Sequence, residues 1–517
     1  MAGARLDVLI PLIIYSIVVF LLGFYSLRFV SRAARRAGKG FLAEYLTGDR
    51  NMGGFVLAMT LVATYLSASS FIGGPGAAAS YGLVWVFLAM SQMPTGYFTL
   101  SVLGKKFAIV ARKINAVTVT DFLRERYESK FLIAIISVSL VFFLIASMTA
   151  QFVGAARLLE GAAGISYQVA LTFFGLTVLL YTIIGGFRAV ALTDTLQGLV
   201  MTAGMILLFG ATIYAGGGVT RIIQELYAID PGLISPLGTD PGTTSVAWVT
   251  SFWILVGFGV IALPQVATRA MSYRDSASMN SAIIYGTVVS MVLLLGMHLI
   301  GAFGRVLVGE VASGDLVVPV LTTHLFPNWL AGLVLAAPLA AAMSTVDSQL
   351  LVAVGAIVND VYANLINRRI KRAAGFTLGC SIAIGAIVFL CAFNPPELLV
   401  WLNLHAIAGL IATFLWPVLL GLYWKRANTA GAFASIIAGA GSYLFLSSKL
   451  FQRWLGELAA ASPQLLESAF FVNLQAGRTL GMHTVVAPVL ISLAAFILFA
   501  YLTPRPSSAV IRKFWGV

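Results

Sequence analysis

Long apolar runs dominate this chain. Runs of about 20 residues, enough to cross the hydrocarbon core of a bilayer as a helix, recur along nearly the whole sequence. Of the 517 residues, 60% are hydrophobic and only 10% are charged, and the mean hydropathy is +0.96. This balance excludes an ordinary water-soluble protein. The sequence therefore predicts an all-α polytopic membrane protein that forms a single transmembrane domain over residues 1–517.

About thirteen transmembrane helices are expected from these runs. They lie near residues 8–30, 53–80, 83–104, 131–157, 168–187, 194–215, 247–270, 279–308, 328–362, 373–394, 397–423, 429–449 and 484–503. An odd number of spans places the two termini on opposite sides of the membrane.

The basic residues orient the spans. Arg5 precedes the first span, whereas the cluster SRAARRAGKG follows it at residues 31–40. Because positively charged loops stay in the cytoplasm, we expect the N-terminus outside and the C-terminus inside, with the protein in the cytoplasmic (inner) membrane. The same order of charges indicates a retained first span rather than a cleaved signal peptide.

The net charge of +13 lies mostly in short loops beside spans, such as INRRIKR at 366–372. Topology explains these charges, so no nucleic acid partner is expected. No long soluble block interrupts the spans, so neither an attached enzymatic domain nor an obligate protein partner is predicted.

Two spans are interrupted by helix-breaking residues. In the second span, ATYLSASSFIGGPGA at 63–77 places glycines around a proline, which offers no amide donor. The expected break is at Gly73, Gly74, Pro75 and Gly76. The seventh span carries VGFGVIALPQ at 256–265, five spans later. This spacing is typical of two inverted five-helix repeats, whose broken helices mark the substrate site. A proline kink bonded by neighbouring Ser and Thr hydroxyls would leave the same trace.

The ninth span carries a face of small and hydroxyl residues. Ala341, Ser344, Thr345 and Ser348 recur at i, i+3, i+4 and i+7. Oxygen ligands without a cluster of carboxylates suit a monovalent cation, and neither a transition metal nor Ca²⁺. Close helix packing through small residues explains the same spacing.

Asp194 and Asp347 are the acids expected within or at the edge of spans. Buried acids in membranes usually serve ion or proton passage, so both are candidates for ion coupling. The alternatives are a helix cap for Asp194 and a water-filled vestibule around Asp347. The four histidines are scattered, and no nucleophile or phosphate-binding motif is found, so no enzymatic activity and no cofactor is expected.

Four separated motifs resemble the sodium:solute symporter family over nearly the whole chain. They are GDRNMGGFVLAMTLVATYLSASSFIGGPGAA, YTIIGGFRAVALTDTLQ, LPQVATRAMSYRDS and AAAMSTVDSQLL, in that order. The resemblance implies a leucine-transporter-like core of two inverted five-helix repeats, here 53–215 and 247–423. One extra span, 8–30, precedes the core, and two more follow it at 429–503.

The resemblance also implies a sodium site between the first and eighth core helices. It implies carbonyl ligands from Ala63, Leu66 and Ala341 and hydroxyl ligands from Ser344 and Thr345. Asp194 matches the family's acid that is associated with sodium coupling. Asp347 stands where relatives often carry a neutral polar residue, which leaves proton participation open.

The cargo is also indicated by resemblance. Two stretches, around residues 62–78 and WLNL…FLWPVLLGLYWKRAN at 401–428, are most similar to family members that carry pantothenate. Proline-transporting relatives have an acid where this chain has Tyr65, which disfavours proline. The implied activity is sodium-coupled import of pantothenate by alternating access.

Pantothenate is a carboxylate, and no Lys or Arg lies near the middle of a core span. We therefore expect the N-terminus of a broken helix and neutral polar groups to receive it. The substrate-binding candidates are Tyr65, Ser67, Ser69, Ser70, Gln92 and Gln265. The alternatives are a sodium- or proton-coupled symporter for another small organic anion, amino acid or sugar, and a passive channel, which would require a continuous polar stripe through several spans.

Overall fold

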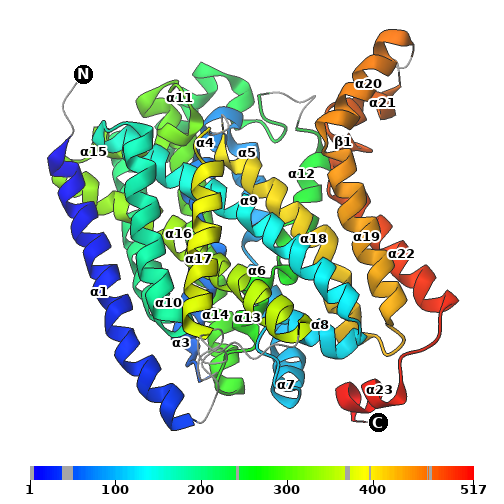
Figure 1. The fold of residues 1–517 in the computed structure, drawn as a ribbon. Helices are drawn as coiled ribbons and strands as arrows, with labels where there is room; N and C mark the ends of the chain where they lie inside the picture. The colour runs from blue at the N-terminus through cyan, green and yellow to red at the C-terminus, as the bar shows by residue number, and fades with distance from the viewer. Residues whose placement is uncertain are drawn as a thin grey trace.

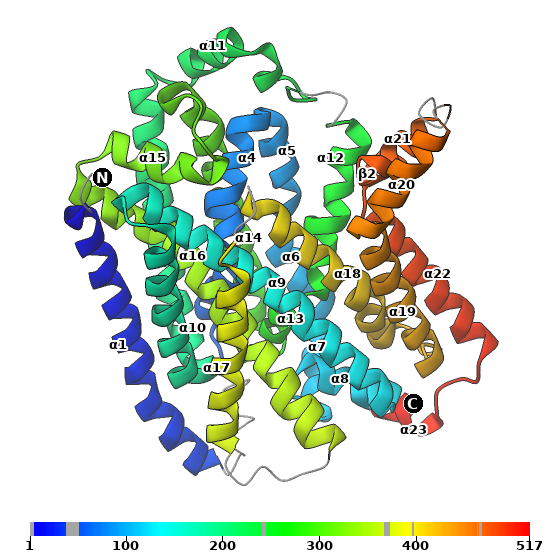
Figure 2. The ribbon, with the colours of Figure 1, turned by 45° about the horizontal axis from the view of Figure 1, so that its top comes forward.

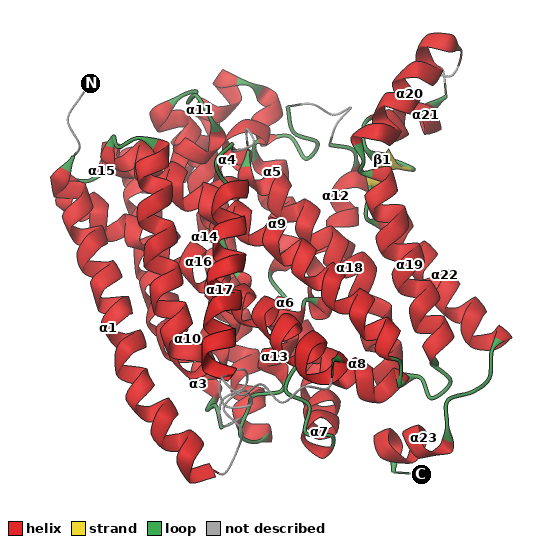
Figure 3. Ribbon diagram, viewed as in Figure 1, coloured by secondary structure: helices red, strands yellow, loops and turns green. Residues whose placement is uncertain are grey.

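The computed structural model describes residues 5–37, 51–239, 244–366, 373–394, 398–462, 464 and 468–516. These residues are almost entirely helical, and the long helices lie side by side in one bundle (Figure 1). Within the described ranges, the only sheet is a short antiparallel hairpin of β1 (Arg478–Thr479) and β2 (Met482–His483), beside α20 and α21 (Figure 3).

The long helices are α1 (Leu6–Ala37), α9 (Lys130–Ala163), α10 (Tyr167–Ala215), α14 (Ser276–Val308), α16 (Asn328–Gly355), α17 (Ala373–Cys391), α18 (Leu399–Tyr423), α19 (Thr429–Leu446) and α22 (Val486–Leu502). The short α-helices are α3 (Gly54–Tyr65), α4 (Gly74–Tyr81), α5 (Leu83–Ala89), α6 (Thr95–Thr99), α7 (Lys105–Lys113), α8 (Val119–Tyr127), α11 (Val219–Ile229), α12 (Val246–Phe252), α13 (Pro264–Ala270), α15 (Val317–Leu325), α20 (Lys449–Ala461), α21 (Ala469–Gln475) and α23 (Ser508–Trp515). The π-helical segments are η1 (Ser69–Gly73), η3 (Leu100–Gly104), η5 (Trp253–Phe258) and η8 (Ala356–Leu365). The 3₁₀ segments are η2 (Met90–Gln92), η4 (Pro231–Ile234), η6 (Gly259–Ala262) and η7 (Gly314–Leu316).

The polytopic architecture is confirmed. By length and composition, eight helices of the described residues could cross a membrane, or ten if each of two bent pairs is one span. Two shorter apolar helical segments, Tyr167–Thr182 and Val486–Leu502, lie where further spans are expected. The expected span at 83–104 is divided among α5, η2, α6 and η3. The count of thirteen and the boundaries of the repeats stay predictions.

Two expected spans, 168–187 and 194–215, meet end to end in α10, which consists of two helical segments joined at a kink. It is kinked at Gly186, where φ is 60° and ψ is −169°. An L-residue would be strained at this positive φ, so the glycine permits the kink. Asp194 thus lies inside a helix rather than at its start, and the helix-cap alternative for this residue is wrong.

The helix α16 lies at the centre of the bundle. Every residue from Val334 to Leu351 is buried, and the helix packs against α9, α10 and α1. The extra first span, α1, lies at one edge of the bundle, and the pair α19 and α22 lies at the opposite edge (Figures 1 and 2). The outer helices therefore surround a core that contains α16 and the two broken helices.

The start of α1 and the C-terminal helix α23 lie at opposite ends of the bundle (Figure 1). This arrangement agrees with an odd number of spans. Which end faces the cytoplasm stays a prediction. The basic cluster at 31–40 lies partly outside the described residues, and so does the run at 366–372.

Candidate functional site

The first broken helix opens at Leu66. Helix α3 ends at Tyr65, Leu66 has extended backbone (φ −77°, ψ 122°), and helical structure resumes at Ser69. The two halves of this span meet at an angle of 69°. Because the chain leaves helical geometry here, carbonyls at the end of α3 are free for other donors or for a cation.

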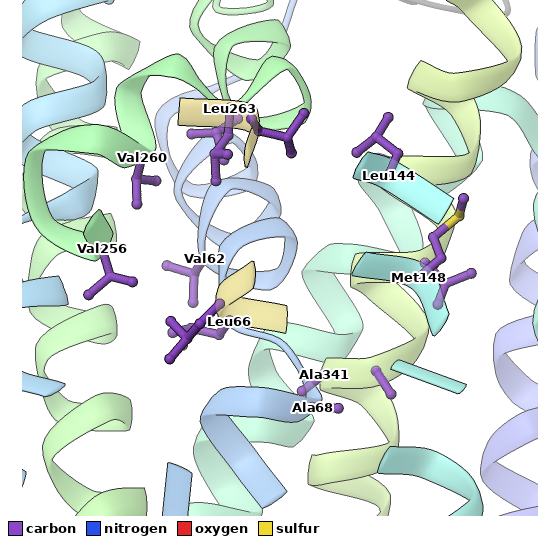
Figure 4. Packing of buried hydrophobic residues seen from close by; sticks show 14 of the residues in the cluster. Val62, Leu66, Ala68, Leu144, Met148, Val256, Val260, Leu263 and Ala341 are labelled. Atoms are coloured by element: carbon purple, nitrogen blue, oxygen red, sulfur yellow. The ribbon is translucent and has the colours of Figure 1, made fainter. Parts of the chain in front are cut away.

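Two hydroxyls of α16 face these carbonyls. Ser344 Oγ donates to the carbonyl of Ala63 at 2.8 Å, and Thr345 Oγ1 lies 3.3 Å from the carbonyl of Leu66. The Ala341 carbonyl lies 3.2 Å from Ser344 Oγ and 3.0 Å from Thr345 Oγ1. The structure thus brings together all five residues of the implied sodium site, each at most 2% exposed. Figure 4 shows Leu66 and Ala341 in this packed region.

The five oxygens are three carbonyls and two hydroxyls, with no charge among them. Such a neutral set of hard ligands suits a monovalent cation such as Na⁺. The hydroxyls can turn their protons away and present lone pairs to an ion, because a hydroxyl is both donor and acceptor. The role of these residues as ion ligands stays a prediction, which their geometry supports.

The first helix does not break where the sequence suggested. The stretch Ser69–Gly73 is a π-helical turn, and α4 follows it with Pro75 in its first turn, where an amide donor is not needed. The expected break at Gly73, Gly74, Pro75 and Gly76 is therefore wrong, because the chain leaves helical geometry at Leu66, several residues earlier.

The glycines of this stretch permit close packing instead. A Cβ on Gly74 would lie 2.4 Å from Nε2 of His298, on α14. A Cβ on Gly76 would lie 2.3 Å from the carbonyl oxygen of Gly314, in η7. Neither position has room for a side chain, so α14 and η7 pack directly on the backbone of α4.

The second broken helix agrees with the prediction for VGFGVIALPQ. Leu263 has extended backbone (φ −68°, ψ 119°), and Pro264 begins α13. The two halves meet at 56°. The two breaks that the leucine-transporter-like core requires are therefore both present.

Asp194 lies in a buried polar cluster with Arg269, which sequence reasoning did not place in the site. Arg269 Nη2 forms an ion pair with Asp194 Oδ2 at 3.2 Å and donates to Ser348 Oγ at 2.6 Å. Thr60 Oγ1 donates to Asp194 Oδ2 at 2.5 Å. The other oxygen of Asp194 has no hydrogen-bond partner among the described residues. The cluster joins α3, α10, α13 and α16 in the interior, where removing one charge of the ion pair would leave the other uncompensated.

Asp347 faces the interior of the bundle, not a water-filled vestibule. Its side chain is 0% exposed. Tyr181 donates to Oδ2 at 2.9 Å, and Ser348 donates to Oδ1 at 3.2 Å. Two acids and one arginine therefore lie within one network, which leaves an excess of acceptors for a mobile cation or a proton.

A cavity lies beside the first break. Its volume is about 40 Å³, room for roughly three water molecules. Five of the six substrate-binding candidates line it: Tyr65, Ser67, Ser69, Ser70 and Gln92. Gln265 does not, because it follows the second break on α13, where its carbonyl accepts from Arg269 at 3.1 Å.

Some polar groups that line this cavity already have hydrogen-bond partners, and others do not. The hydroxyl of Tyr65 lies 3.0 Å from Gln92 Oε1 and 2.9 Å from the carbonyl of Val256. The Ser69 hydroxyl is buried and has no partner among the described residues. Ser69 is therefore available to a ligand, whereas Tyr65 and Gln92 are already paired.

Sequence reasoning missed several cavity residues. Trp85, His298 and Asn403 also line the cavity. Asn403 Oδ1 accepts from Ser147 at 2.9 Å and lies 3.3 Å from the amide of Gln151. Asn403 could have been found, because a polar amide in an apolar span is usually functional.

The 3₁₀ segment η7 covers the far end of α4. Asp315 is 0% exposed, and its Oδ2 accepts from the amide of Leu399, at the start of α18, at 3.0 Å. Burial raises the pKa of Asp315 to about 6, against the opposing effects of that hydrogen bond and of the Arg157 charge. Asp315 thus ties η7 to α18 above the broken helix.

Known proteins resemble this chain over most of its length. Residues 45–439 match the model of the sodium:solute symporter family. A sodium/pantothenate symporter of Escherichia coli K12 is 45% identical over 499 residues, which are 95% of this chain and 96% of the relative. A sodium/pantothenate symporter of Haemophilus influenzae is 46% identical over 447 residues, 86% and 91% of the two chains. An osmoregulated proline transporter of Bacillus subtilis is 27% identical over 518 residues, 98% and 97% of the two chains.

The fold has solved counterparts. A Na⁺-coupled sialic acid symporter, in a substrate-bound outward-open state, superposes with a TM-score of 0.74 at 19% identity and covers 97% of this chain and 99% of its own. A nucleobase-cation-symport transporter superposes with a TM-score of 0.52 at 14% identity, covering 91% and 97%. The leucine-transporter-like fold is thereby confirmed.

Proposed function

Because the chain belongs to the sodium:solute symporter family, we propose that it imports pantothenate together with Na⁺ by alternating access, with no covalent chemistry. The cargo follows from the two pantothenate symporters, which are 45% and 46% identical over most of the chain. The proline transporter shares 27% identity over a similar length, so the difference favours pantothenate. We place the protein in the cytoplasmic membrane, with its N-terminus outside.

The observation that carries the coupling is the contact between α3 and α16. A cation bound to the carbonyls of Ala63 and Leu66 and to the hydroxyls of Ser344 and Thr345 would join the two elements. Binding would therefore favour whichever state holds them together. In this proposal Asp194 and Asp347 provide the negative charge along the path of the ion.

The carboxylate of pantothenate would be received beside the first break. Ser67, Ser69 and Ser70 precede α4, and the partial positive charge of a helix N-terminus favours an anion there. A cavity of about 40 Å³ holds only a few waters, so the surrounding helices must separate to admit pantothenate. Such separation is the movement that alternating access requires.

The test uses the purified protein in proteoliposomes with labelled pantothenate. An inward sodium gradient should drive accumulation above the external concentration, and dissipating the gradient should abolish it. Equilibration without accumulation would indicate a passive channel.

The cargo is tested by competition with unlabelled pantothenate, proline, a sugar and other small carboxylates. Pantothenate should be the strongest inhibitor. If another solute inhibits uptake and excess pantothenate does not, the cargo assignment is wrong. Accumulation of pantothenate that is driven by a proton gradient in the absence of sodium would contradict sodium coupling.

A further inference from the structure

A second cavity lies where the C-terminal segment returns to the bundle. Its volume is about 260 Å³, several times that of the cavity beside the first break. Its walls come from the junction of α8 and α9, the start of α19 and the segment between α22 and α23. The lining residues are Arg126, Tyr127, Glu128, Asn428, Thr429, Ala430, Thr503, Pro504, Arg505, Pro506, Ser507 and Val510.

The inner wall holds a buried arginine that lacks an acidic partner. Arg126 is 1% exposed, and its Nε donates to the carbonyl of Gly421 at 2.8 Å. Its Nη2 donates to the carbonyl of Trp424 at 3.1 Å. Nη1 has no hydrogen-bond partner among the described residues. No carboxylate forms an ion pair with this guanidinium in the described part of the chain, and it also contacts the rings of Tyr127, Phe514 and Trp515. A positive charge without an acidic partner therefore lies beside the cavity.

The outer wall holds a second arginine. Arg505 is exposed and forms no hydrogen bond or ion pair within the described ranges. It stands between Pro504 and Pro506, whose fixed φ angles limit the freedom of this segment. The amide of Asn428 donates to the carbonyl of Pro504 at 2.8 Å and anchors the segment to α19. The guanidinium is thus presented by a restrained backbone.

One carboxylate opposes these charges. Glu128 also lines the cavity, with its side chain exposed, so the lining carries two positive charges and one negative charge. The starts of α19 and α23 add the partial positive charge of two helix N-termini. The cavity therefore favours an anion, and Glu128 weakens that preference.

The apolar surface next to the cavity indicates that the anion belongs to a membrane lipid. The last turns of α22 expose apolar side chains to the bundle exterior: Leu498 (55%), Phe499 (43%), Tyr501 (61%) and Leu502 (70%). Arg505 follows directly after this lipid-facing surface ends. A cavity with two arginines at the end of such a surface lies at the level of lipid headgroups.

We propose that this cavity binds the phosphate of an anionic phospholipid headgroup, with Arg505 at its entrance and Arg126 at its inner wall. Arg505 suits this ligand because its planar group can donate two parallel hydrogen bonds to phosphate oxygens. Arg126 adds its positive charge and Nη1, since its Nε and Nη2 are bound to carbonyls. The cavity lies at the same end of the bundle as the basic residues of α7, α8 and α23, which we assign to the cytoplasmic side (Figure 1). The bound lipid would belong to that leaflet.

The experiment is a titration of the detergent-purified full-length protein with phosphatidylglycerol, read by native mass spectrometry. Arg505→Gln should weaken binding about fivefold, the usual effect of one charge at a membrane surface. Glu128→Gln should tighten binding by a similar factor, because it removes the opposing carboxylate. Arg274→Gln is the matched control, since Arg274 is 59% exposed, lies away from the cavity and pairs with Asp275. It should bind as the unchanged protein does.

Three outcomes would overturn the proposal. Arg505→Gln could bind phosphatidylglycerol as tightly as Arg274→Gln, or phosphatidylcholine could bind as tightly as phosphatidylglycerol. Inorganic phosphate could bind with the same affinity as the lipid and respond equally to both cavity variants, which would identify a site for a soluble anion. Arg126 is left unchanged because it caps α18, and its loss would impair folding.

Discussion

Removing the two hydroxyls of α16 tests the sodium site, and the structure predicts that the two removals differ. Thr345 Oγ1 lies 3.3 Å from the Leu66 carbonyl, so it contributes little to the contact between α3 and α16 without an ion. Thr345→Ala should therefore lose mainly an ion ligand. A lost charge-assisted contact of about 1–3 kcal/mol corresponds to a roughly 5- to 150-fold weaker sodium affinity.

Ser344 donates to the Ala63 carbonyl at 2.8 Å, which is a well-formed hydrogen bond. Ser344→Ala thus destabilises the ion-free state as well, by about 1 kcal/mol. This loss subtracts from the change in ion affinity, so Ser344→Ala should weaken sodium binding several-fold less than Thr345→Ala. Thr345→Ser keeps the oxygen and should be mild.

The assay is the sodium concentration that gives half-maximal pantothenate uptake in proteoliposomes, at matched protein content. Ser381→Ala is the control, because the Ser381 hydroxyl is buried on α17 and bonds only its own helix, at the carbonyl of Thr377 (2.9 Å). Near-normal sodium activation in both Ser344→Ala and Thr345→Ala would refute the site and leave close helix packing as the role of this face. A larger effect for Ser344→Ala would refute the ranking of the two hydroxyls.

Three further predictions concern the ion pair of Asp194 and Arg269, the buried Asp315 of η7, and Gly76 of α4. Asp194→Asn should raise the sodium concentration for half-maximal uptake and lower thermal stability, because it leaves Arg269 uncompensated. Adding Arg269→Gln should restore stability but not sodium activation, and recovery of both would mean that the pair is only structural. The folded protein holds the proton of Asp315 more tightly than the unfolded chain, so native stability should fall as pH rises from about 4 to about 6. Asp315→Asn should therefore raise the apparent melting temperature at pH 8 and change it little at about pH 3.5, below the ordinary pKa of the carboxyl, and a pH-independent difference would contradict this. Gly76→Ala should impair uptake because its Cβ meets backbone at 2.3 Å, whereas Gly379→Ala, with nothing within 4 Å, should not.

The membrane architecture could be predicted because hydropathy is a property of each segment alone. The hydroxyl face of α16 was also visible, since a regular helix converts the spacing of Ala341, Ser344 and Thr345 directly into a surface. The prediction of a break at VGFGVIALPQ succeeded because Pro264 marks the start of the following helix.

The glycine and proline pattern misplaced the first break, which only the family resemblance indicated through the carbonyls of Ala63 and Leu66, because glycine and proline serve two purposes. Pro75 is accommodated in the first turn of α4, and Gly76 makes room for Gly314, which is more than 200 residues away in the chain. The break at Leu66 carries no such residue. Its position depends on the partners that α16 offers to the freed carbonyls, and no local pattern records them.

Arg269 was missed for a related reason. An arginine toward the end of a predicted span is usually a topology signal. Its partners Asp194 and Ser348 come from two other helices. Gln265 lies outside the cavity beside the first break, on α13, whose Arg269 belongs to the same cluster, and its role in binding substrate stays a prediction.

The proposed sodium site and the buried ion pair of Asp194 and Arg269 both adjoin the contact between α3 and α16. Thr64 follows Ala63 on α3, and its hydroxyl lies 3.2 Å from that of Ser348, one helical turn beyond Ser344. Ser348 in turn accepts from Arg269 at 2.6 Å. A movement that separates α3 from α16 would therefore disturb the proposed ion ligands and also the Thr64–Ser348 contact, whose Ser348 hydroxyl is the acceptor for Arg269. If Na⁺ binds at the proposed site, we therefore expect its occupancy to change the free energy of the Arg269 pairing through this shared contact, without any direct contact between the ion and the arginine.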